Sequence, residues 1–282
     1  MNFSLIEISK HDYLVLGKLL TERFGIKLPP EKQIMFQARL QSRLRELKMN
    51  SFDLYREFIL DPANTNAEME EMIGYISTNK TEFFREQQHF NVLHDRIFPD
   101  MLDSGQLENE AFLNCWSAGC SKGQEAFTLA MVIDWFRQEQ LVDFDFNILG
   151  TDVSKKVLEV ACNGIYPYRE IRQIPDGYLK KYVLRSKDQT QLKIKIVRSL
   201  RNQVQFRYGN LMDSDYQMNN PFQIIFLRNT LIYFSLEDQT AILKKVLKYL
   251  MTGGYLFIGH SESLVNRDLP LRIVAPSVYK KI

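Results

Sequence analysis

The chain has 282 residues, of which 45% are apolar and 25% are charged, and its formal net charge is +2 at pH 7. This composition is typical of a soluble globular protein with one large domain or two modest ones. It excludes a strongly basic nucleic-acid-binding chain, and no apolar run approaches the roughly 18 residues that a transmembrane helix requires. We therefore expect no nucleic-acid partner and no insertion into a membrane.

The N-terminal segment and the cysteines bear on the cellular compartment. Residues 1–12 lack a basic flank leading into an apolar core, so we expect no signal peptide. Cys115, Cys120 and Cys162 are odd in number and do not have the spacing of metal ligands. The sequence therefore predicts reduced thiols, a cytoplasmic protein and no metal site.

Residues 1 to about 95 have helical periodicity, and no β-rich segment interrupts them. The second expected helix carries Ile34, Leu40 and Leu44 on one apolar stripe, and Ser51 or Asp53 is suited to cap the third. Four helices are expected, at residues 11–24, 31–48, about 52–60 and 67–77. The pattern predicts a small helical bundle.

After Gly105, apolar strand patterns alternate with helical patterns, which predicts a mainly parallel sheet covered by helices on both faces. Strands are expected at residues 111–116, 144–150, 204–208, 222–227 and 254–259, with helices near 124–138, 154–162 and 237–250. Residues 166–203 do not fit the alternation and predict a helix with a short antiparallel ribbon. We therefore expect a helical domain at 1–80, a linker at 81–105, and an α/β domain at 106–282 with a β insert at about 166–203.

The turn Gly119-Cys-Ser-Lys-Gly123 lies between a strand and a helix. Such a turn can present backbone N–H groups to a nucleotide-like ligand, and Asp152, at the tip of the second strand, is placed to accept ribose hydroxyls. Glu125, at the start of the helix, would repel a dinucleotide pyrophosphate but not a ligand that carries an amine and a sulfonium. This favours S-adenosylmethionine over NAD. The alternative is that Glu125 only stabilises the helix dipole.

Two polar segments lie where they can complete a ligand cleft. Asn79-Lys-Thr-Glu-Phe-Phe-Arg85 falls at the junction of the two domains, although it could equally be a linker that buries its aromatic residues. Arg228, Asn229 and Tyr233 follow the fourth strand, at the edge of a parallel sheet where ligands bind. His260 invites a general-base role, but no nucleophile motif accompanies it, so we expect a structural histidine.

The helix at residues 31–48 is rich in basic residues. Arg39 and Arg43 are four residues apart, so they share a face and would repel each other unless an acidic partner arrived. With Arg45 they suit a docking surface for an acidic helix, although such runs are usually a solvated face. Interleaved aromatic residues, typical of nucleic-acid platforms, are absent.

Together these motifs resemble the chemotaxis-receptor glutamate methyltransferases of the CheR type. The resemblance runs from about residue 10 to residue 280, and the motifs occur in the family's order. They are Asn79-x-Thr81-x-Phe-Phe-Arg85, Trp116-Ser-Ala-Gly-Cys-Ser-x-Gly-x-Glu125, Thr151-Asp152, Asn210-Leu211, Arg228-Asn229-x-x-Ile-Tyr-Phe234 and Gly259-His-Ser-Glu262. The resemblance implies a Rossmann-like S-adenosylmethionine methyltransferase domain with a small antiparallel β insert, preceded by an all-α domain.

The resemblance also implies an activity, a partner and a set of site residues. The family transfers methyl groups from S-adenosylmethionine to glutamates on the cytoplasmic helices of chemoreceptors, leaving S-adenosylhomocysteine. By this resemblance Asp152 holds the ribose, Glu125 holds the amino end of the methionine, and Arg39, Arg43 and Arg45 meet the receptor. The remaining expected cofactor residues are Asn79, Thr81, Arg85, Gly119, Asn210, Leu211, Arg228 and Asn229. The family also implies a monomer, and no exposed apolar stripe argues otherwise.

The implied chemistry needs no general base, because a glutamate carboxylate with a pKa of about 4.3 is ionised at neutral pH. Catalysis would then rest on alignment and partial desolvation of that carboxylate, and Arg85 and Tyr233 are the candidates for steering it. Residues 185–192 of the insert contain no glycine, so we predict no tether to an aromatic receptor pentapeptide. Two alternatives stay open: a methyltransferase of the same fold with another substrate, and a signalling module that binds the cofactor without turnover.

Overall fold

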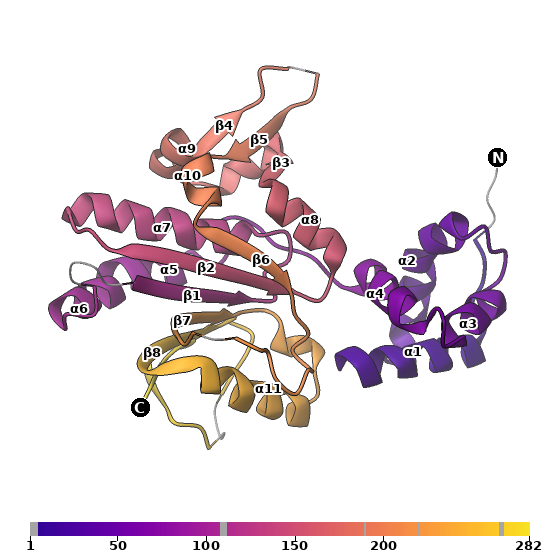
Figure 1. Cartoon of the computed structure of the whole chain (residues 1–282). Helices are drawn as coiled ribbons and strands as arrows, with labels where there is room; N and C mark the ends of the chain where they lie inside the picture. The colour runs from indigo at the N-terminus through magenta and orange to yellow at the C-terminus, as the bar shows by residue number, and fades with distance from the viewer. Residues whose placement is uncertain (1–4, 108–111, 189, 219, 265–267) are drawn as a thin grey trace.

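The computed structural model describes residues 5–107, 112–188, 190–218, 220–264 and 268–282. Figure 1 shows a group of N-terminal helices beside a larger α/β body, with a small β insert projecting from that body. In the described parts of the chain, no helix has both the length and the apolarity to cross a lipid bilayer.

The N-terminal helices form where capping residues and apolar spacing predict them. Ser9 caps α1 by accepting a hydrogen bond from the Asp12 N–H at 3.0 Å, and Gly25 ends that helix in the left-handed region with φ of 68°. Ser51, not Asp53, caps α3. The helices are α1 (Lys10–Phe24), α2 (Gln33–Glu46), α3 (Phe52–Leu60) and α4 (Thr65–Ile76), with a short 3-10 helix η1 (Pro30–Lys32) before α2.

These four helices bury a separate apolar core that includes Leu20, Leu40 and Tyr55. The expectation that Ile34 lies on the buried stripe of α2 is wrong, because its side chain is 80% exposed. The buried position on that helix is Phe36, whose ring packs edge-on against Tyr13 at 5.3 Å between centroids. Position 36 lies four residues before Leu40, so the helix still buries one face at regular helical spacing.

Residues 81–105, expected as a linker, contain an almost continuous helical segment. It consists of α5 (Gln88–Val92), a π-helical stretch η2 (Leu93–Ile97) and α6 (Phe98–Asp103). Phe90, Leu93 and Phe98 from this segment are buried in the core of the α/β body. The segment therefore belongs structurally to the α/β body, because its apolar face packs there.

The large sheet has seven strands in the order β6-β2-β1-β7-β8-β10-β9. Its strands are β1 (Phe112–Ala118), β2 (Asp145–Asp152), β6 (Val204–Tyr208), β7 (Phe222–Leu227), β8 (Leu250–Ile258), β9 (Leu271–Ala275) and β10 (Val278–Lys281). The first five strands of the order are parallel, and β10 is antiparallel to both of its neighbours. The sequence did not predict β9 and β10, and residue 111, where the first strand was expected to begin, lies outside the described residues.

Helices cover both faces of this sheet (Figure 1). Cys115 of β1 faces the core that α7 (Gln124–Gln140) completes, whereas its neighbour Trp116 faces the core completed by α11 (Leu236–Tyr249). This alternation is the period of two that a strand buried on both sides requires. Helix α8 (Lys155–Asn163) follows β2, and the short α10 (Arg198–Arg201) leads into β6.

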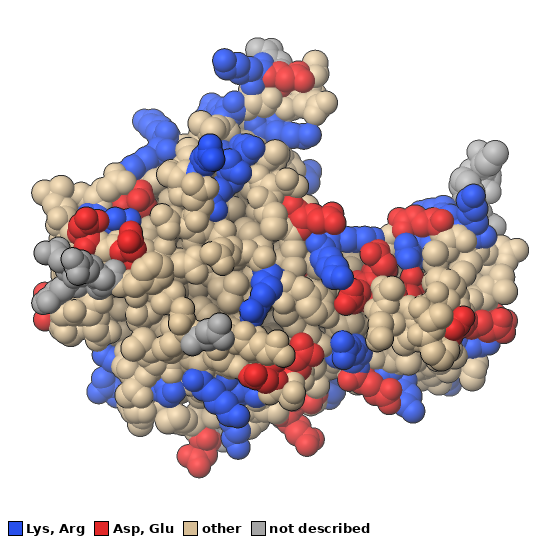
Figure 2. Space-filling view, in the orientation of Figure 1, with Lys and Arg blue, Asp and Glu red and all other residues tan. Residues whose placement is uncertain are grey.

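The insert is a separate antiparallel sheet in the order β3-β5-β4, as the sequence predicts. Its strands are β3 (Ile165–Pro167), β4 (Val183–Arg185) and β5 (Lys193–Ile196), and it also contains the 3-10 helix η3 (Tyr168–Gln173) and α9 (Asp176–Tyr182). Figure 2 shows lysines and arginines gathered over this insert at the top of the view.

The strand order reverses between β1 and β7, and the carboxyl ends of strands at such a point form the crevice of a doubly wound sheet. The helical domain lies beside this crevice. Two ion pairs join α4 to α8, with Lys155 Nζ at 2.5 Å from Glu70 Oε2 and Lys156 Nζ at 3.4 Å from Glu71 Oε2. The crevice therefore has walls from both domains.

Candidate active site

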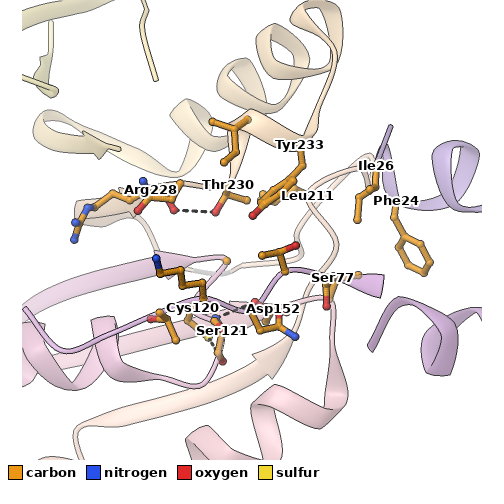
Figure 3. Close-up of a pocket in the computed structure, with 18 of the residues that line it drawn as sticks. Phe24, Ile26, Ser77, Cys120, Ser121, Asp152, Leu211, Arg228, Thr230 and Tyr233 are labelled. Carbon is orange, nitrogen blue, oxygen red and sulfur yellow. Dashed lines mark hydrogen bonds between the residues drawn. The ribbon is translucent and has the colours of Figure 1, made fainter. Parts of the chain in front are cut away.

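A cavity of about 280 Å³ lies at this crevice, between the helical domain and the carboxyl ends of the strands. Figure 3 shows Asp152 and Ser121 on one side of it, Arg228 and Tyr233 on the other, and Phe24 at the end formed by the helical domain. The structure brings together all the residues expected to hold a cofactor or to steer a substrate. The cavity lining includes Asn79, Thr81, Arg85, Gly119, Glu125, Asp152, Asn210, Leu211, Arg228, Asn229 and Tyr233.

The turn after β1 is held by its own backbone. The N–H groups of Gly119 and Cys120 both donate to the Thr151 carbonyl, at 2.8 and 2.9 Å, and the Ser121 N–H donates to Asp152 Oδ2 at 2.9 Å. The expectation that this turn offers its N–H groups to a ligand is therefore wrong for these three residues. Their hydrogen bonds instead tie β1 to β2 and fix the position of Asp152.

Asp152 accepts one backbone hydrogen bond on each carboxylate oxygen, from Ser121 and from Ser154 at 2.9 Å each. No ion pair to it is formed within the described residues. Burial raises the pKa of Asp152, and the backbone hydrogen bonds lower it in part. Since each oxygen can accept a second hydrogen bond, the carboxylate is oriented and still able to receive two hydroxyl groups.

Glu125 lies in the first turn of α7, and its side chain is 17% exposed. Ser117 Oγ donates to Glu125 Oε1 at 2.7 Å, and Arg228 Nη1 donates to Glu125 Oε2 at 3.2 Å. Burial raises the pKa of Glu125, while the positive charge of Arg228 lowers it in part. An additional ammonium group in the cavity would favour the ionised carboxylate.

Arg228 and Asn229 belong to a buried network that sequence reasoning only partly found. Arg228 bridges Glu125 and Glu86, with its Nη2 at 3.0 Å from Glu86 Oε2. Asn229, at φ of 54°, donates from Nδ2 to Glu86 Oε1 at 3.0 Å. Glu262 accepts three backbone N–H groups, from Gly259 at 2.6 Å, Asn229 at 2.9 Å and Leu231 at 2.7 Å. The network holds the loop after β7 in place.

Glu86 and Glu262 were not assigned roles from the sequence, although each adjoins a recognised motif. Glu86 directly follows the segment that ends at Arg85, and Glu262 ends the Gly259-His-Ser-Glu262 motif. The available signal was an acidic residue directly after the first motif and another at the end of the second. Both carboxylates bind groups of segments that are distant in the sequence. The spacing of apolar residues therefore does not reveal their roles.

Asn210 and Leu211 occupy the loop after β6. Asn210 is buried and joins the domains, because its Nδ2 donates to the Arg23 carbonyl of α1 at 2.8 Å and its Oδ1 accepts from the Met212 N–H at 3.0 Å. Leu211 lines the cavity together with Phe24. These contacts provide an apolar end that suits an aromatic base, and they make the helical domain part of the pocket.

The two candidates for steering a substrate lie at the partly exposed side of the cavity. Arg85 donates from Nη1 to the Lys80 carbonyl at 2.9 Å, which ties its guanidinium to the backbone of the segment between the two domains. Tyr233 ends the 3-10 helix η4 (Leu231–Tyr233), and its carbonyl accepts from the Lys27 N–H at 3.4 Å. Both are half-buried, so an incoming side chain can reach them.

The donors and acceptors of the lining fit S-adenosylmethionine. Glu125 can supply an anion for an amino group, Asp152 can supply two acceptors for ribose hydroxyls, and Leu211 lies in the apolar part. The hydroxyl groups of Ser77 and Ser121 are buried in the lining, and no hydrogen-bond partner is formed with them among the described residues. The cavity volume is close to the lower end of the range of small-molecule sites, roughly 300–1,000 Å³.

The three arginines expected to form a docking surface do not line the cavity. Two of them, Arg39 and Arg43, already bond to other groups of the helical domain. Arg43 pairs with Glu68 through two hydrogen bonds of 2.9 and 2.6 Å, and with Glu46 at 3.1 Å. Arg39 donates to the carbonyls of Ile76 and Ser77 at the end of α4. The premise that Arg39 and Arg43 await an external acidic partner is therefore wrong for Arg43.

The exposed member of the set is Arg45, which donates to Ser42 Oγ at 3.1 Å. It lies on the side of α2 that faces solvent. A docking role for the three arginines stays a prediction, and the structure makes Arg45 the one whose charge is available to a partner without breaking an internal pair.

Comparison with known proteins gives consistent matches along the chain. Residues 79–279 match the SAM binding domain of CheR methyltransferase, and residues 11–77 match its all-alpha domain. A chemotaxis protein methyltransferase from Borreliella burgdorferi is 36% identical over 277 residues, covering 98% of this chain and 96% of that protein. Chemotaxis protein methyltransferase 2 from Pseudomonas aeruginosa is 32% identical, covering 96% and 93%, and the Escherichia coli chemotaxis protein methyltransferase is 30% identical, covering 97% and 92%. The chain therefore belongs to the CheR methyltransferase family, with S-adenosylmethionine as its cofactor.

Proposed function

We propose that the protein transfers methyl groups from S-adenosylmethionine to glutamate side chains on the cytoplasmic helices of chemoreceptors. The observation that carries the proposal is the cavity between the domains, where Glu125 and Asp152 face the space that Arg85 and Tyr233 border. The names of the relatives, chemotaxis protein methyltransferases, support a role in chemotaxis. Such a role implies a cytoplasmic protein.

The proposed roles follow from the positions of the side chains. Glu125 binds the amino end of the cofactor, Asp152 binds its ribose, and Leu211 contacts its base. When bound, the cofactor supplies an electrophilic sulfonium methyl group, which the substrate carboxylate takes up with release of S-adenosylhomocysteine. Arg85 attracts that carboxylate, and Tyr233 orients it at the partly exposed side of the cavity. No proton has to be removed, because the carboxylate is ionised at neutral pH.

The receptor is proposed to dock on α2, where the accessible charge is that of Arg45. Arg45→Glu should weaken methylation of the receptor while leaving cofactor affinity unchanged, because this residue lies outside the cavity. Arg43→Glu is unsuitable for the same test, since it would place a second carboxylate against that of Glu68, a buried residue. Equal receptor methylation by Arg45→Glu and the unaltered chain would reject this docking surface.

The experiment for the whole proposal uses radiolabelled S-adenosylmethionine and a cytoplasmic chemoreceptor fragment from the same cell. Base-labile label on the fragment is expected, and it should be lost in Asp152→Ala. The matched control is Asp103→Ala, an exposed aspartate at the end of α6 that lies outside the cavity lining. Label that resists base would show another acceptor group, and cofactor binding without any label would show another substrate or a non-catalytic role.

Tyr233→Phe separates orientation of the substrate from formation of the cofactor pocket. If Tyr233 orients the carboxylate, kcat should fall while the Kd for the cofactor stays unchanged. Both constants are measured with the receptor fragment, by methyl transfer and by calorimetry. A parallel loss in both constants would show that the phenol is only part of the cofactor pocket.

A further inference from the structure

A second group of ligating side chains lies behind Arg228, outside the cavity lining. It consists of Glu86, His89 and His260, and each of them offers one ligand atom within 4.8 Å of the other two. Sequence analysis does not reveal this group, because His260 is 171 positions after His89 and no short spacing joins them. None of the three residues is among those that line the cofactor cavity.

His89 is the part of this group that calls for an explanation. Its side chain is 1% exposed, and neither ring nitrogen has a hydrogen-bond partner of good geometry among the described residues. Its Nδ1 lies 3.5 Å from Glu86 Oε2. Buried polar groups in folded proteins are nearly always satisfied, so an imidazole facing a carboxylate without a good hydrogen bond suggests that something else belongs between them.

The surroundings of His89 suit a metal ligand. One ring nitrogen of His89 lies within 4.8 Å of a ligand atom of Glu86 and of one of His260, so two further ligands are close to it. Neutral imidazole is the form that binds metal ions. Because both ring nitrogens lack a hydrogen bond among the described residues, His89 can give one to an ion and keep the other for the second contact that metal-bound histidines make.

The geometry needs only one side chain to move. Two ligands at tetrahedral zinc are roughly 3.3 Å apart, and His89 Nδ1 and Glu86 Oε2 are already separated by 3.5 Å. The His260 ring centroid is 4.6 Å from that of His89, at an angle of 77°. Because His260 is exposed, its ring can turn toward the other two without disturbing the core.

We propose that Glu86, His89 and His260 form a binding site for a divalent transition-metal ion of the zinc type. Two imidazoles and a carboxylate suit zinc, and three protein ligands leave a position for water on the exposed side. Calcium and magnesium prefer oxygen ligands and are disfavoured. The nearest positive charge is that of Arg228, whose Nη2 lies 3.0 Å from Glu86 Oε2. The ion would therefore compete with this guanidinium for one carboxylate oxygen.

The site would be coupled to the cofactor cavity through Arg228. This guanidinium binds Glu86 on one side and Glu125 on the other, at 3.0 and 3.2 Å. A bound ion would add positive charge beside the contacts that join Glu86, Arg228 and Glu125. S-adenosylmethionine carries a net positive charge and S-adenosylhomocysteine carries none, so the ion should oppose binding of the first more than binding of the second. This step rests on the placement of the cofactor beside Glu125, and by linkage the opposition is reciprocal.

The first test is zinc binding by the full chain, freed of metal with a chelator and then titrated with zinc alone in a calorimeter. We expect one strong site that is lost in His260→Asn and kept in His11→Asn, a matched change of an exposed histidine on α1. His260 carries the test because it is exposed, whereas replacement of the buried His89 risks unfolding. No strong site, or an equal site in His260→Asn, would overturn the proposal.

The second test measures the Kd of S-adenosylmethionine and of S-adenosylhomocysteine with and without saturating zinc. We expect zinc to weaken S-adenosylmethionine about fivefold or more, to weaken S-adenosylhomocysteine less, and to do neither in His260→Asn. An equal effect on both ligands would overturn the coupling through charge. If the protein binds zinc but neither S-adenosylmethionine nor S-adenosylhomocysteine, the cofactor site is rejected and the metal site is retained. The failure of one proposal can therefore be distinguished from the failure of the other.

Discussion

Gly119 offers a quantitative test of how the turn after β1 is packed. Its φ is +81°, and a β-carbon placed there would lie 2.5 Å from Thr230 Oγ1 and 3.1 Å from Thr230 Cγ2. In Gly119→Ala the left-handed backbone should cost about 1–2 kcal/mol, and the contact with Thr230 about 1–3 kcal/mol more. We expect a loss of roughly 2–5 kcal/mol in the free energy of unfolding and weaker cofactor binding.

Three further variants separate the two contributions. Thr230→Ala removes the atoms that a new β-carbon would meet, at the cost of one hydrogen bond from Thr230 Oγ1 to the Arg228 carbonyl at 3.0 Å. Gly119→Ala combined with Thr230→Ala should therefore be more stable than the sum of the single changes by about 1–3 kcal/mol. Gly253→Ala is the matched control for strain alone, because its φ is +82° and its nearest contact is Lys280 Cε at 4.0 Å.

The assay is urea unfolding of the unaltered chain and the four variants, with cofactor affinity measured by calorimetry. Additive single changes, within about 0.5 kcal/mol, would refute the contact between position 119 and Thr230. A loss in Gly253→Ala as large as that in Gly119→Ala would show that backbone strain alone explains the effect.

Two further predictions concern charged groups. Arg43→Ala should destabilise the helical domain by about 3 kcal/mol, because among the described residues it leaves the buried Glu68 carboxylate with Tyr55 as its one side-chain partner. Arg45→Ala should change stability by less than about 0.5 kcal/mol. Equal losses on urea unfolding would contradict the internal pairing of Arg43 with Glu68. Burial raises the pKa of Glu125, so affinity for S-adenosylmethionine should be full when the carboxylate is ionised and fall as the pH drops through a value above the ordinary 4.5. Calorimetry between pH 8 and pH 5 checks this, and the same decline in Glu125→Gln would assign it to another group.

The sequence predicted the elements whose signals are local. The cap of the third helix at Ser51, one of its two candidates, the end of the first helix at Phe24 and the alternating strands all depend on neighbouring residues, and all are confirmed. The cofactor cavity could also be anticipated, because the carboxyl ends of parallel strands lie on one edge of a sheet. Motif residues that follow different strands must then meet there.

What the sequence missed depends on contacts between distant segments. β9 and β10 form an antiparallel end of the sheet with residues partly exposed, so neither has the apolar run of a buried parallel strand. Arg43 was interpreted as a free charge because its partner, Glu68, lies 25 positions away on another helix. Glu86 likewise meets Arg228 and Asn229 across more than 140 positions. Such pairs follow from the tertiary fold and leave no periodic trace.

The helical domain is part of the cofactor site as well as a neighbour of it. A β-carbon at Gly25 would lie 2.7 Å from Met212 Sδ and from Phe234 Cδ1, so the end of α1 packs directly against two loops of the α/β body. Asn210 reaches across the same junction to the Arg23 carbonyl. Since α2 also contributes Met35 to the cavity lining, the proposed docking helix and the cofactor pocket share one packed junction. If a receptor docks on α2 as we propose, it must leave this junction closed, because displacement of α2 would open the pocket.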